Sequence, residues 1–525
     1  MGKDVDVDEN GFIASGALLA RHGQLPYRDY HYNHMPTEVF VYAALFRLTD
    51  HLLLVARVFQ SVCAAGAATA LFATAYGAAE SFKRRRRLAF AWAIGLLLLT
   101  NPLFFKTAGI SWNHDFPLLM ALLGFLALRR GLRQGRSFVL TACSGFLLAM
   151  AATSRLTFLP IAAAFILLVF LDPGQSVHRR AGLLGSFAAG FLIASLPSLW
   201  VWSRSWQNAF FGNFLYPRLN TEIHEQRDEH ALFTLLPILA YYLRSWFTLP
   251  GNGVITLAFL GLAAAKLRRG RWRHDARQAE LLSIAAIAGL LIASGFMPAP
   301  PYPQYFYAAT PFMILGLALM LAGGDGAPFQ RKTWGLMTAA FVFCVVFGAP
   351  AYYRLWRLPS PSRWVPIQAH QIGNEIAGRL DPGIVLTLEP LFPLEGGMDT
   401  DARFATGRFG IRVADLLTPS QRRQYLMPAA HELGQVVEED SPSAILIVRG
   451  SDAAGERGLI AAALAHHYVP IVLASPGGHG QPHARAWVRP RRLNGPEKAE
   501  VAGQKPQGDL DYSPSPPYFD RKVLH

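Results

Sequence analysis

Repeated apolar runs, each long enough to cross a lipid bilayer, constrain the fold of this chain more than any other feature. Hydrophobic residues make up 52% of its 525 residues and charged residues only 16%, which is too apolar for an ordinary soluble protein of this size. A helix needs roughly 20 apolar residues to cross the hydrocarbon core. The sequence predicts spans at 52–79, 88–105, 114–128, 137–153, 156–171, 182–203, 279–297, 305–322 and 334–352.

Two further apolar segments, 231–247 and 253–266, are less regular. They are consistent with one long span, or with a re-entrant helix followed by a span. The chain then crosses the membrane about ten times, and each crossing is a helix because unpaired backbone groups are prohibitive in lipid. The predicted fold class is therefore an all-α polytopic membrane bundle over residues 51–353.

The loops between the predicted spans alternate in charge. Basic clusters occur at 83–87, 129–136, 179–180, 266–277 and 331–332, and the intervening loops nearly lack them. The positive-inside rule places these clusters in the cytoplasm. Segments 1–50, 105–114, 204–230 and 298–304 and everything after residue 353 are then outside. The net charge of +14 reflects this anchoring pattern, so we expect no nucleic-acid partner.

The N-terminus does not fit this orientation by itself. The chain begins Met1-Gly2-Lys3 without a signal peptide, in a segment that should be external. Either a polar tail crosses unaided or an upstream first span is missing from this sequence, and we favour the second explanation. The cysteines Cys63, Cys143 and Cys344 all fall in predicted spans, and we expect them to be packing residues.

After residue 353 the composition changes to that of a soluble module, which we expect to form a small extracytoplasmic α/β domain over 354–491. Short buried strands are predicted at 384–388, 444–448 and 468–473, with helices near 364–379, 418–438 and 455–466. The domain lacks a phosphate-binding loop at a helix start, so we expect a scaffold or acceptor-docking role. The proline-rich tail, 492–525, is expected to be disordered.

Ionisable and aromatic residues gather in the segments predicted to be external. They are Asp8 and Glu9, then Asn113, His114 and Asp115 where a span starts, then Arg155 between two spans, then Gln304 and Tyr305. Ionisable residues at the ends of spans usually face an interior cavity. A carboxylate there can deprotonate a hydroxyl while Arg and His balance a phosphate. Each has a simpler explanation: a solvated tail, a helix cap, an arginine extending to the headgroups, or an interfacial aromatic belt.

These residues carry a resemblance to a known family. Asp8-Glu9, the run from Ala20 to Asp29, and His34-Met35-Pro36 resemble the first external loop of GT-C glycosyltransferases. The branch is the bacterial one related to protein O-mannosyltransferases and the lipid A aminoarabinose transferase. Further short motifs fit the same pattern: Ala56-Arg57, Asn113-His114-Asp115, Ser154-Arg155-Leu156-Thr157 and Gln304-Tyr305.

The resemblance assigns roles to residues of this chain. It implies that Asp8 is the catalytic base, with Glu9 beside it in a first external loop formed by residues 1–50. The substrate-binding residues that we expect are Tyr27, Arg28, His34, Lys106, Asn113, His114, Asp115, Arg155, Gln304 and Tyr305. Two features depart from the family: its first span is absent, and His34-Met35-Pro36 stands where a Lys-Pro-Pro is common. Phosphate contact then falls to His34, Arg28, Lys106 or Arg155.

The resemblance also implies a function. The expected protein is a multi-pass enzyme of a bacterial inner membrane that transfers a sugar, with inversion, from a polyprenyl-phosphate donor to a lipid, glycan or protein acceptor facing the periplasm or exterior. No cofactor is expected, although the O and N donors of Asp8, Glu9, His114 and Asp115 also suit a divalent metal. The alternatives are a transporter or lipid flippase of envelope polysaccharide assembly, or a non-catalytic assembly protein. A single outer cavity would favour transfer chemistry, and a path open alternately to both faces would favour transport.

Overall fold

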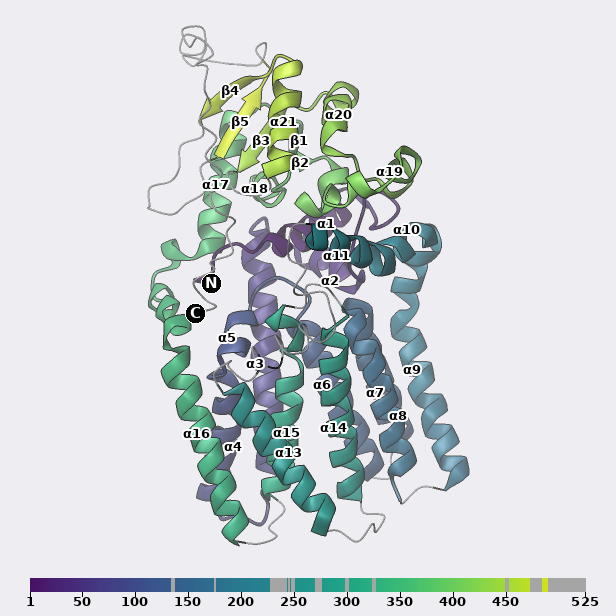
Figure 1. Cartoon of the computed structure of the whole chain (residues 1–525), viewed down its shortest axis with the longest axis vertical. Coiled ribbons are helices and arrows are strands. Elements are labelled where there is room, and N and C mark those ends of the chain that lie inside the picture. The colour runs from purple at the N-terminus through teal and green to yellow at the C-terminus, as the bar shows by residue number, and fades with distance from the viewer. Residues whose placement is uncertain are drawn as a thin grey trace.

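The computed structural model of the chain consists of a bundle of long helices with a smaller layered region at one end (Figure 1). It describes residues 1–133, 137–173, 176–226, 243, 246, 251–269, 276–297, 302–322, 327–448, 453–472 and 484–489. The helices of the bundle are α3 (Leu52–Ala78), α4 (Arg84–Leu99), α6 (Asp115–Arg133), α7 (Ser137–Ser154), α8 (Ala162–Leu171), α9 (Val177–Arg204), α13 (Asn252–Arg269), α14 (Ala276–Gly295), α15 (Ala309–Ala322) and α16 (Ala327–Tyr352).

The bundle is that of a membrane protein, as its apolar helices show. Four helical segments in the described part of the chain combine the length and apolarity of a membrane span: Leu52–Ala78, Val177–Arg204, Ala276–Gly295 and Pro303–Ala322. Shorter apolar helices at Phe138–Ser154, Leu156–Leu171, Asn252–Lys266 and Met337–Ala349 lie among them. The less regular predicted segment 231–247 lies outside the described residues except at 243 and 246.

One predicted span ends earlier than expected. The segment 88–105 was predicted to be continuous, but α4 stops at Leu99 and the short helix α5 (Pro102–Thr107) follows. The side chain of Asn101 accepts hydrogen bonds from the N–H groups of Leu103 and Phe104, and Pro102 occupies the first turn. An Asn cap followed by proline is a strong helix start, so the sequence itself ends the span and begins a new element.

The two ends of the bundle differ in their charges. The ends of α3, α6 and α8 and the starts of α4, α9 and α14 lie at the end farthest from the sheet (Figure 1). At that end Arg129 and Arg133 both bind Glu280, with Nε–O distances of 3.0 and 2.7 Å. The predicted grouping of basic loops on one side therefore matches the folding of the chain.

Residues 1–50, predicted to be an external loop, contain two helices. These are α1 (Val7–His22) and α2 (Thr37–Leu45), and they lie between the bundle and the sheet (Figure 1). The side chain of Asp6 caps α1 by accepting from the N–H of Asp8 at 3.0 Å. A Cβ at Gly16 would come within 2.7 Å of the Tyr42 side chain, so a glycine here permits the close approach of α1 and α2.

The C-terminal region contains a five-stranded sheet in its described part, with strand order β2-β1-β3-β5-β4. The strands are β1 (Ile384–Thr387), β2 (Asp399–Thr400), β3 (Ala444–Val448), β4 (Val469–Val472) and β5 (Ala484–Val488). β1 pairs in parallel with β2 and β3, and β5 pairs antiparallel with β3 and β4. The three predicted strands are present, whereas β2 and β5 were not predicted.

Helices pack beside this sheet: α17 (Val365–Arg379), α18 (Leu391–Glu395), α19 (Pro419–Tyr425), α20 (Leu433–Asp440) and α21 (Ala453–Ala465). The prediction of one helix over 418–438 was wrong, because two helices occupy that range. Leu426 takes a left-handed conformation with φ 58°, and the N–H of Met427 bonds back to the carbonyl of Arg422 at 3.0 Å. This is a helix-ending pattern, and Pro428 follows it.

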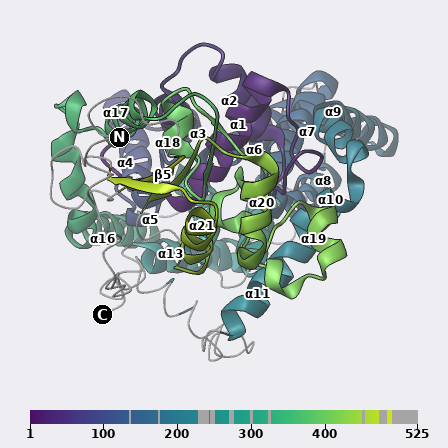
Figure 2. The same ribbon diagram turned by 90° about the horizontal axis from the view of Figure 1, so that it is seen from above.

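The C-terminal region contacts one end of the bundle. Connecting helices α10 (Trp206–Phe210) and α11 (Tyr216–Gln226) run beneath α19, as the two views agree (Figures 1 and 2). The hydroxyl of Tyr216 donates to the carbonyl of Phe409 at 3.1 Å. The rings of Phe211 and Tyr425 stack at 3.8 Å. The contact brings side chains of the C-terminal region over the end of the bundle.

Candidate active site

A small cavity lies at the end of the bundle nearest the C-terminal region, where α6 starts and α7 ends. Its walls come from segments far apart in the sequence: the start of α6, the junction of α7 with the short helix η1 (Leu156–Ile161), α14, and the short helix η4 (Pro303–Phe306). The lining residues are His114, Arg155, Thr157, Phe158, Leu291, Gln304, Tyr305, Tyr307 and Ala308. Four of the predicted site residues are therefore brought together here.

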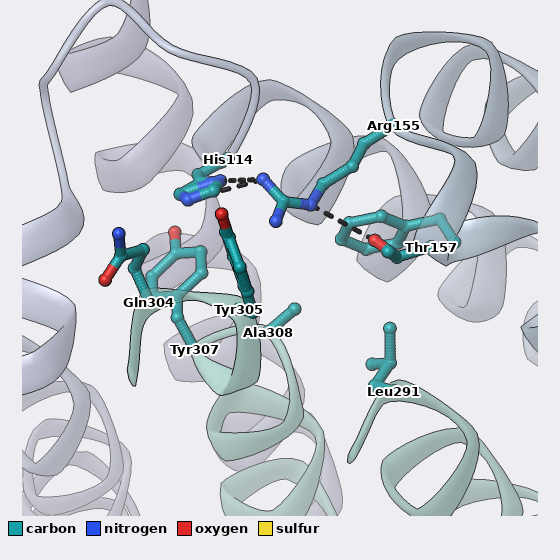
Figure 3. Close-up of a pocket in the computed structure, with 9 residues that line it drawn as sticks. His114, Arg155, Thr157, Leu291, Gln304, Tyr305, Tyr307 and Ala308 are labelled. Atoms are coloured by element: carbon teal, nitrogen blue, oxygen red, sulfur yellow. Dashed lines mark hydrogen bonds between the residues drawn. The ribbon is translucent and has the colours of Figure 1, made fainter. Parts of the chain in front are cut away.

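Arg155 provides the positive charge of this cavity (Figure 3). It stands in extended conformation before η1. Its Nη1 donates to Oδ1 of Asn113 at 3.0 Å and its Nε to the Thr157 hydroxyl at 3.1 Å, while the Tyr305 ring lies 5.2 Å from the guanidinium carbon. No carboxylate of the described residues lies within ion-pair distance. A half-buried arginine held only by neutral groups is suited to an anionic ligand.

The contact between Arg155 and His114 fixes the state of the histidine. Nη1 of Arg155 bonds to Nδ1 of His114, and Figure 3 shows the two side chains facing each other. A guanidinium has only donors, so Nδ1 must accept. The same Nη1 also lies 3.3 Å from Nε2 of His114, and an imidazole that accepts from a guanidinium is neutral. It can donate one hydrogen bond to a ligand without adding a positive charge.

Asp115 is buried behind the cavity wall and does not line the cavity. Its Oδ1 accepts from the hydroxyl of Tyr307 at 2.5 Å and its Oδ2 from the N–H of Gly109 at 2.7 Å. Both oxygens thus fix parts of the wall: one holds Tyr307 of the cavity, and the other holds the turn before α6. Asp8 does not line the cavity either; of the acidic residues Asp8 and Asp115 and their neighbours, only His114 belongs to its wall.

Asp8 occupies the first turn of α1, where it is half-buried. Its carboxylate accepts no hydrogen bond from the described residues, yet it lies within the electrostatic reach of Arg408, Arg412 and Arg155. Burial raises the pKa of Asp8 above its ordinary value, Glu9 adds to that rise, and the three arginines oppose it. A carboxylate that has a raised pKa and no hydrogen-bond donor among the described residues, within the electrostatic reach of Arg155 in the cavity wall, has the properties of a general base.

Glu9 is placed quite differently, although it is the next residue. It is fully buried and receives two hydrogen bonds from Arg57, at 2.8 and 2.6 Å. The N–H and hydroxyl of Ser111 and the N–H of Asp6 also donate to it. Burial opposes its ionisation, but the charge of Arg57 and these hydrogen bonds lower the pKa of Glu9. Its oxygens are occupied, so it joins α1, α3 and the loop before α6.

The remaining predicted residues divide into two groups. His34 stacks on Phe12 at 4.8 Å, and burial together with the charge of Arg155 lowers the pKa of His34 to about 3, so it lies close to the cavity as a neutral ring. Tyr27 is buried and donates to the carbonyl of His34, which shapes that loop. Arg28 is instead paired with Asp29 at the surface, and Lys106 is exposed; neither lines the cavity.

Two features of the site were missed by the sequence prediction. Glu38 is fully buried, and neither of its carboxylate oxygens has a hydrogen-bond partner. Burial and the charge of Asp115 raise the pKa of Glu38 well above its usual range. Arg408 and Arg412, from the C-terminal region, act on Asp8. The acidic residue within His34–Glu38 was a usable signal for the first; nothing in the sequence singled out the two arginines.

Of the four residues that could bind a metal, Asp8, Glu9, His114 and Asp115, three already use their ligand atoms in bonds to other protein groups. Glu9 is held by Arg57, Asp115 by Tyr307 and Gly109, and Nδ1 of His114 by Arg155. In the part of the chain that the structure describes, these four do not form a group with ligand atoms close enough for one ion. The residues present therefore do not fit a shared metal.

Comparisons with known proteins identify the fold. No family model matches this sequence, and no curated protein matches it. The structure is similar to that of ArnT from Cupriavidus metallidurans in the apo state, with a TM-score of 0.57 and 14% identity over 92% of this chain and 94% of that one. ArnT bound to undecaprenyl phosphate gives 0.55 and 14% over the same shares.

ArnT is a lipid A aminoarabinose transferase of the GT-C fold, and this chain has that fold over nearly its whole length. The resemblance predicted from the short motifs is thereby confirmed at the level of the fold.

Proposed function

We propose that the protein is an integral membrane glycosyltransferase that moves a sugar from a polyprenyl-phosphate donor to an extracytoplasmic acceptor. The proposal rests on two charges that act on each other at this end of the bundle. Arg155 lines the cavity and has no carboxylate partner among the described residues, and Asp8 accepts no hydrogen bond from them and lies within the electrostatic reach of Arg155. Displacement of a sugar from a phosphate needs a base on one side and a cation on the other.

The donor is assigned from the fold and from Arg155. A structure with the same fold holds undecaprenyl phosphate, and Arg155 offers a guanidinium fork suited to a phosphate. The cavity lies where apolar helices end, so a polyprenyl tail can stay in hydrocarbon between the helices while its phosphate reaches the cavity. Gln304 and Tyr305 then line the space for the sugar.

The chemistry follows as one displacement. Asp8 takes the proton of an acceptor hydroxyl, the hydroxyl oxygen bonds to the anomeric carbon, and the bond from that carbon to the phosphate oxygen breaks. The polyprenyl phosphate that leaves is stabilised by Arg155 and by a hydrogen bond from Nε2 of His114. Attack opposite to the leaving group inverts the anomeric centre. Glu9 is a positioning residue that fixes the first turn of α1 through Arg57. No metal takes part in this scheme.

We expect the acceptor to reach Asp8 from the side of α1 where the C-terminal region lies (Figure 1). Arg408 and Arg412 lie near the base, so the C-terminal region contributes charge at the site besides its docking role. We assign the protein to the inner membrane of a bacterium, with this region facing the periplasm or exterior. The acceptor is an envelope lipid, glycan or protein.

The test compares cells that lack the gene with cells complemented by wild-type or Asp8→Asn protein. Mass spectrometry of lipid-linked sugars and envelope glycans should show an accumulated polyprenyl-phosphate sugar and one missing glycan modification in the deletion strain. Wild type should reverse both changes and Asp8→Asn neither. If Asp8→Asn complements fully, the enzyme proposal fails. Normal total donor that is confined to the inner leaflet would instead favour the flippase alternative.

A further inference from the structure

A second cluster of ligating side chains lies away from the cavity, where the start of α3 meets the C-terminal region. Asp50 and His51 directly precede α3, and His370 lies in α17. Each of these residues offers one ligand atom, and the three atoms lie within 4.8 Å of one another. The rings of His51 and His370 are only 3.8 Å apart between centroids. Residues separated by more than three hundred positions thus converge on one point.

The histidine nitrogens are prepared for a ligand. Nδ1 of His51 is buried and has no hydrogen-bond partner, which is costly unless something binds there. Nδ1 of His370 bonds to Oε2 of Glu395 at 2.9 Å, and this leaves its Nε2 for a ligand. A histidine whose second nitrogen is held by a carboxylate is the usual arrangement around protein-bound metals.

Glu395 is itself fixed in place. It lies at the end of α18 with a fully buried side chain, and its Oε1 accepts from the N–H of Leu53 at 2.6 Å. The same carboxylate therefore caps α3 and orients His370. The cluster connects three elements, α3, α17 and α18, across the boundary between the bundle and the C-terminal region.

We propose that Asp50, His51 and His370 bind a divalent transition metal ion, with Zn²⁺ the best match, and that the ion fastens the C-terminal region to the start of α3. Two imidazoles and a carboxylate are typical zinc ligands, with water as the fourth. In a tetrahedral site with bonds of about 2.0–2.2 Å, ligand atoms are roughly 3.4 Å apart. The three ligand atoms lie within 4.8 Å of one another, which is farther apart than this. Asp50 is exposed, so rotation of its side chain can bring its carboxylate to the shorter distance. This site is independent of the proposed transferase reaction.

The test measures zinc on the untagged, full-length protein purified in detergent. The protein is stripped with EDTA, freed of chelator, given one equivalent of ZnSO₄, desalted and analysed by mass spectrometry of the metal. Wild type should retain about one zinc ion per chain, and His370→Ala should retain none above background. The matched control is His431→Ala, an exposed histidine of the same region that lies 3.9 Å from Asp415, and it should retain the wild-type amount.

Zinc affinities are measured by competition with a chromophoric chelator. They are measured in two further variants, so the test does not depend on the folding of His370→Ala alone. Asp50→Ala changes an exposed side chain and should weaken zinc binding at least about tenfold. Glu395→Gln should weaken it by about 10–100-fold. Zinc should also raise the thermal midpoint of wild type by a few degrees and leave that of His370→Ala unchanged.

Two outcomes would overturn the proposal. One is wild-type protein that holds no more zinc than His370→Ala. The other is zinc that survives His51→Ala and His370→Ala but is lost in His114→Ala, which would place the ion in the cavity.

Discussion

Two arginine–carboxylate regions lie at the end of the bundle nearest the C-terminal region, and they differ in whether their charges are satisfied. Around Glu9 and Arg57, both side chains are completely buried and joined by two hydrogen bonds. Around Asp8 and Arg155, the carboxylate accepts no hydrogen bond and the arginine has only neutral partners among the described residues. Adjacent residues of one helix turn therefore differ: the carboxylate of Glu9 is fully bonded, and that of Asp8 has no hydrogen-bond donor among the described residues.

The largest effect should come from breaking the buried ion pair of Arg57 and Glu9. Arg57→Ala leaves Glu9 buried without its counter-ion, and losing one partner of a buried pair costs about 3–5 kcal/mol. We expect a large fall in the thermal midpoint, measured by fluorescence-detected gel filtration in detergent. Arg28→Ala is the control, because Arg28 is paired with Asp29 at the surface and such pairs contribute about 0–1 kcal/mol. Equal falls in the thermal midpoint of Arg57→Ala and Arg28→Ala would contradict the structural role of the buried pair.

Asp8→Asn should show the opposite behaviour, with loss of activity at unchanged stability. The amide keeps the size of the side chain but cannot take a proton, so turnover should fall by about 10² or more. The thermal midpoint should stay near wild type, because no hydrogen bond to the carboxylate is lost. Asp4→Asn, in the same segment and with a side chain 64% exposed, should keep wild-type turnover. Near-normal turnover of Asp8→Asn would remove Asp8 as the base.

Glu9→Gln provides the complementary measurement. It should reduce turnover less than Asp8→Asn and reduce stability more, since it weakens the bonds to Arg57 and Ser111. Turnover and thermal midpoint of the two variants, measured side by side, separate the roles. A stable Glu9→Gln protein with turnover as low as that of Asp8→Asn would instead make Glu9 part of the chemistry.

The sequence predicted much of the fold because the apolar runs and basic loops are local signals that lipid enforces. It also predicted that Arg155, His114, Gln304 and Tyr305 share one end of the bundle. The resemblance named Asp8 as the base with Glu9 beside it, but the sequence could not show what holds Glu9, since that depends on Arg57 and on Ser111, which is 102 positions away. Arg408 and the β2 and β5 strands were missed for the same reason: long-range packing decides them, and their local patterns are weak.

Arg155→Ala should have an intermediate effect. Losing charge-assisted hydrogen bonds to a phosphate, each worth about 1.5–3 kcal/mol, should lower kcat/KM for the donor about 10–100-fold. Arg155→Lys should recover part of the lost kcat/KM, because lysine keeps the positive charge but lacks the planar guanidinium fork. Lys106→Ala is the control: Lys106 is exposed on α5 and does not line the cavity, so transfer should change little. Similar losses in Arg155→Ala and Lys106→Ala would mean that phosphate binds elsewhere.

The smallest effect concerns pH, and it tests whether the C-terminal region acts on the base. Burial raises the pKa of Asp8, with Arg412 among the charges that oppose the rise. Asp8 must be ionised to act, so kcat/KM should be lost as pH falls through this raised pKa, and the acid limb should lie above the ordinary Asp value of about 4. Asp6, whose pKa is raised to about 7 by burial, Asp8 and Glu9, titrates beside it.

Arg412→Gln removes one opposing positive charge, so the pKa of Asp8 should rise further and the acid limb of kcat/KM should move to higher pH. The plateau at high pH, where Asp8 is ionised in both proteins, should change less than the limb. Arg423→Gln is the matched control, since Arg423 is an exposed arginine of α19 and is not among the charges that act on Asp8. An acid limb that stays in place in Arg412→Gln, or moves equally in Arg423→Gln, would mean that the C-terminal region only covers the site and does not tune its base.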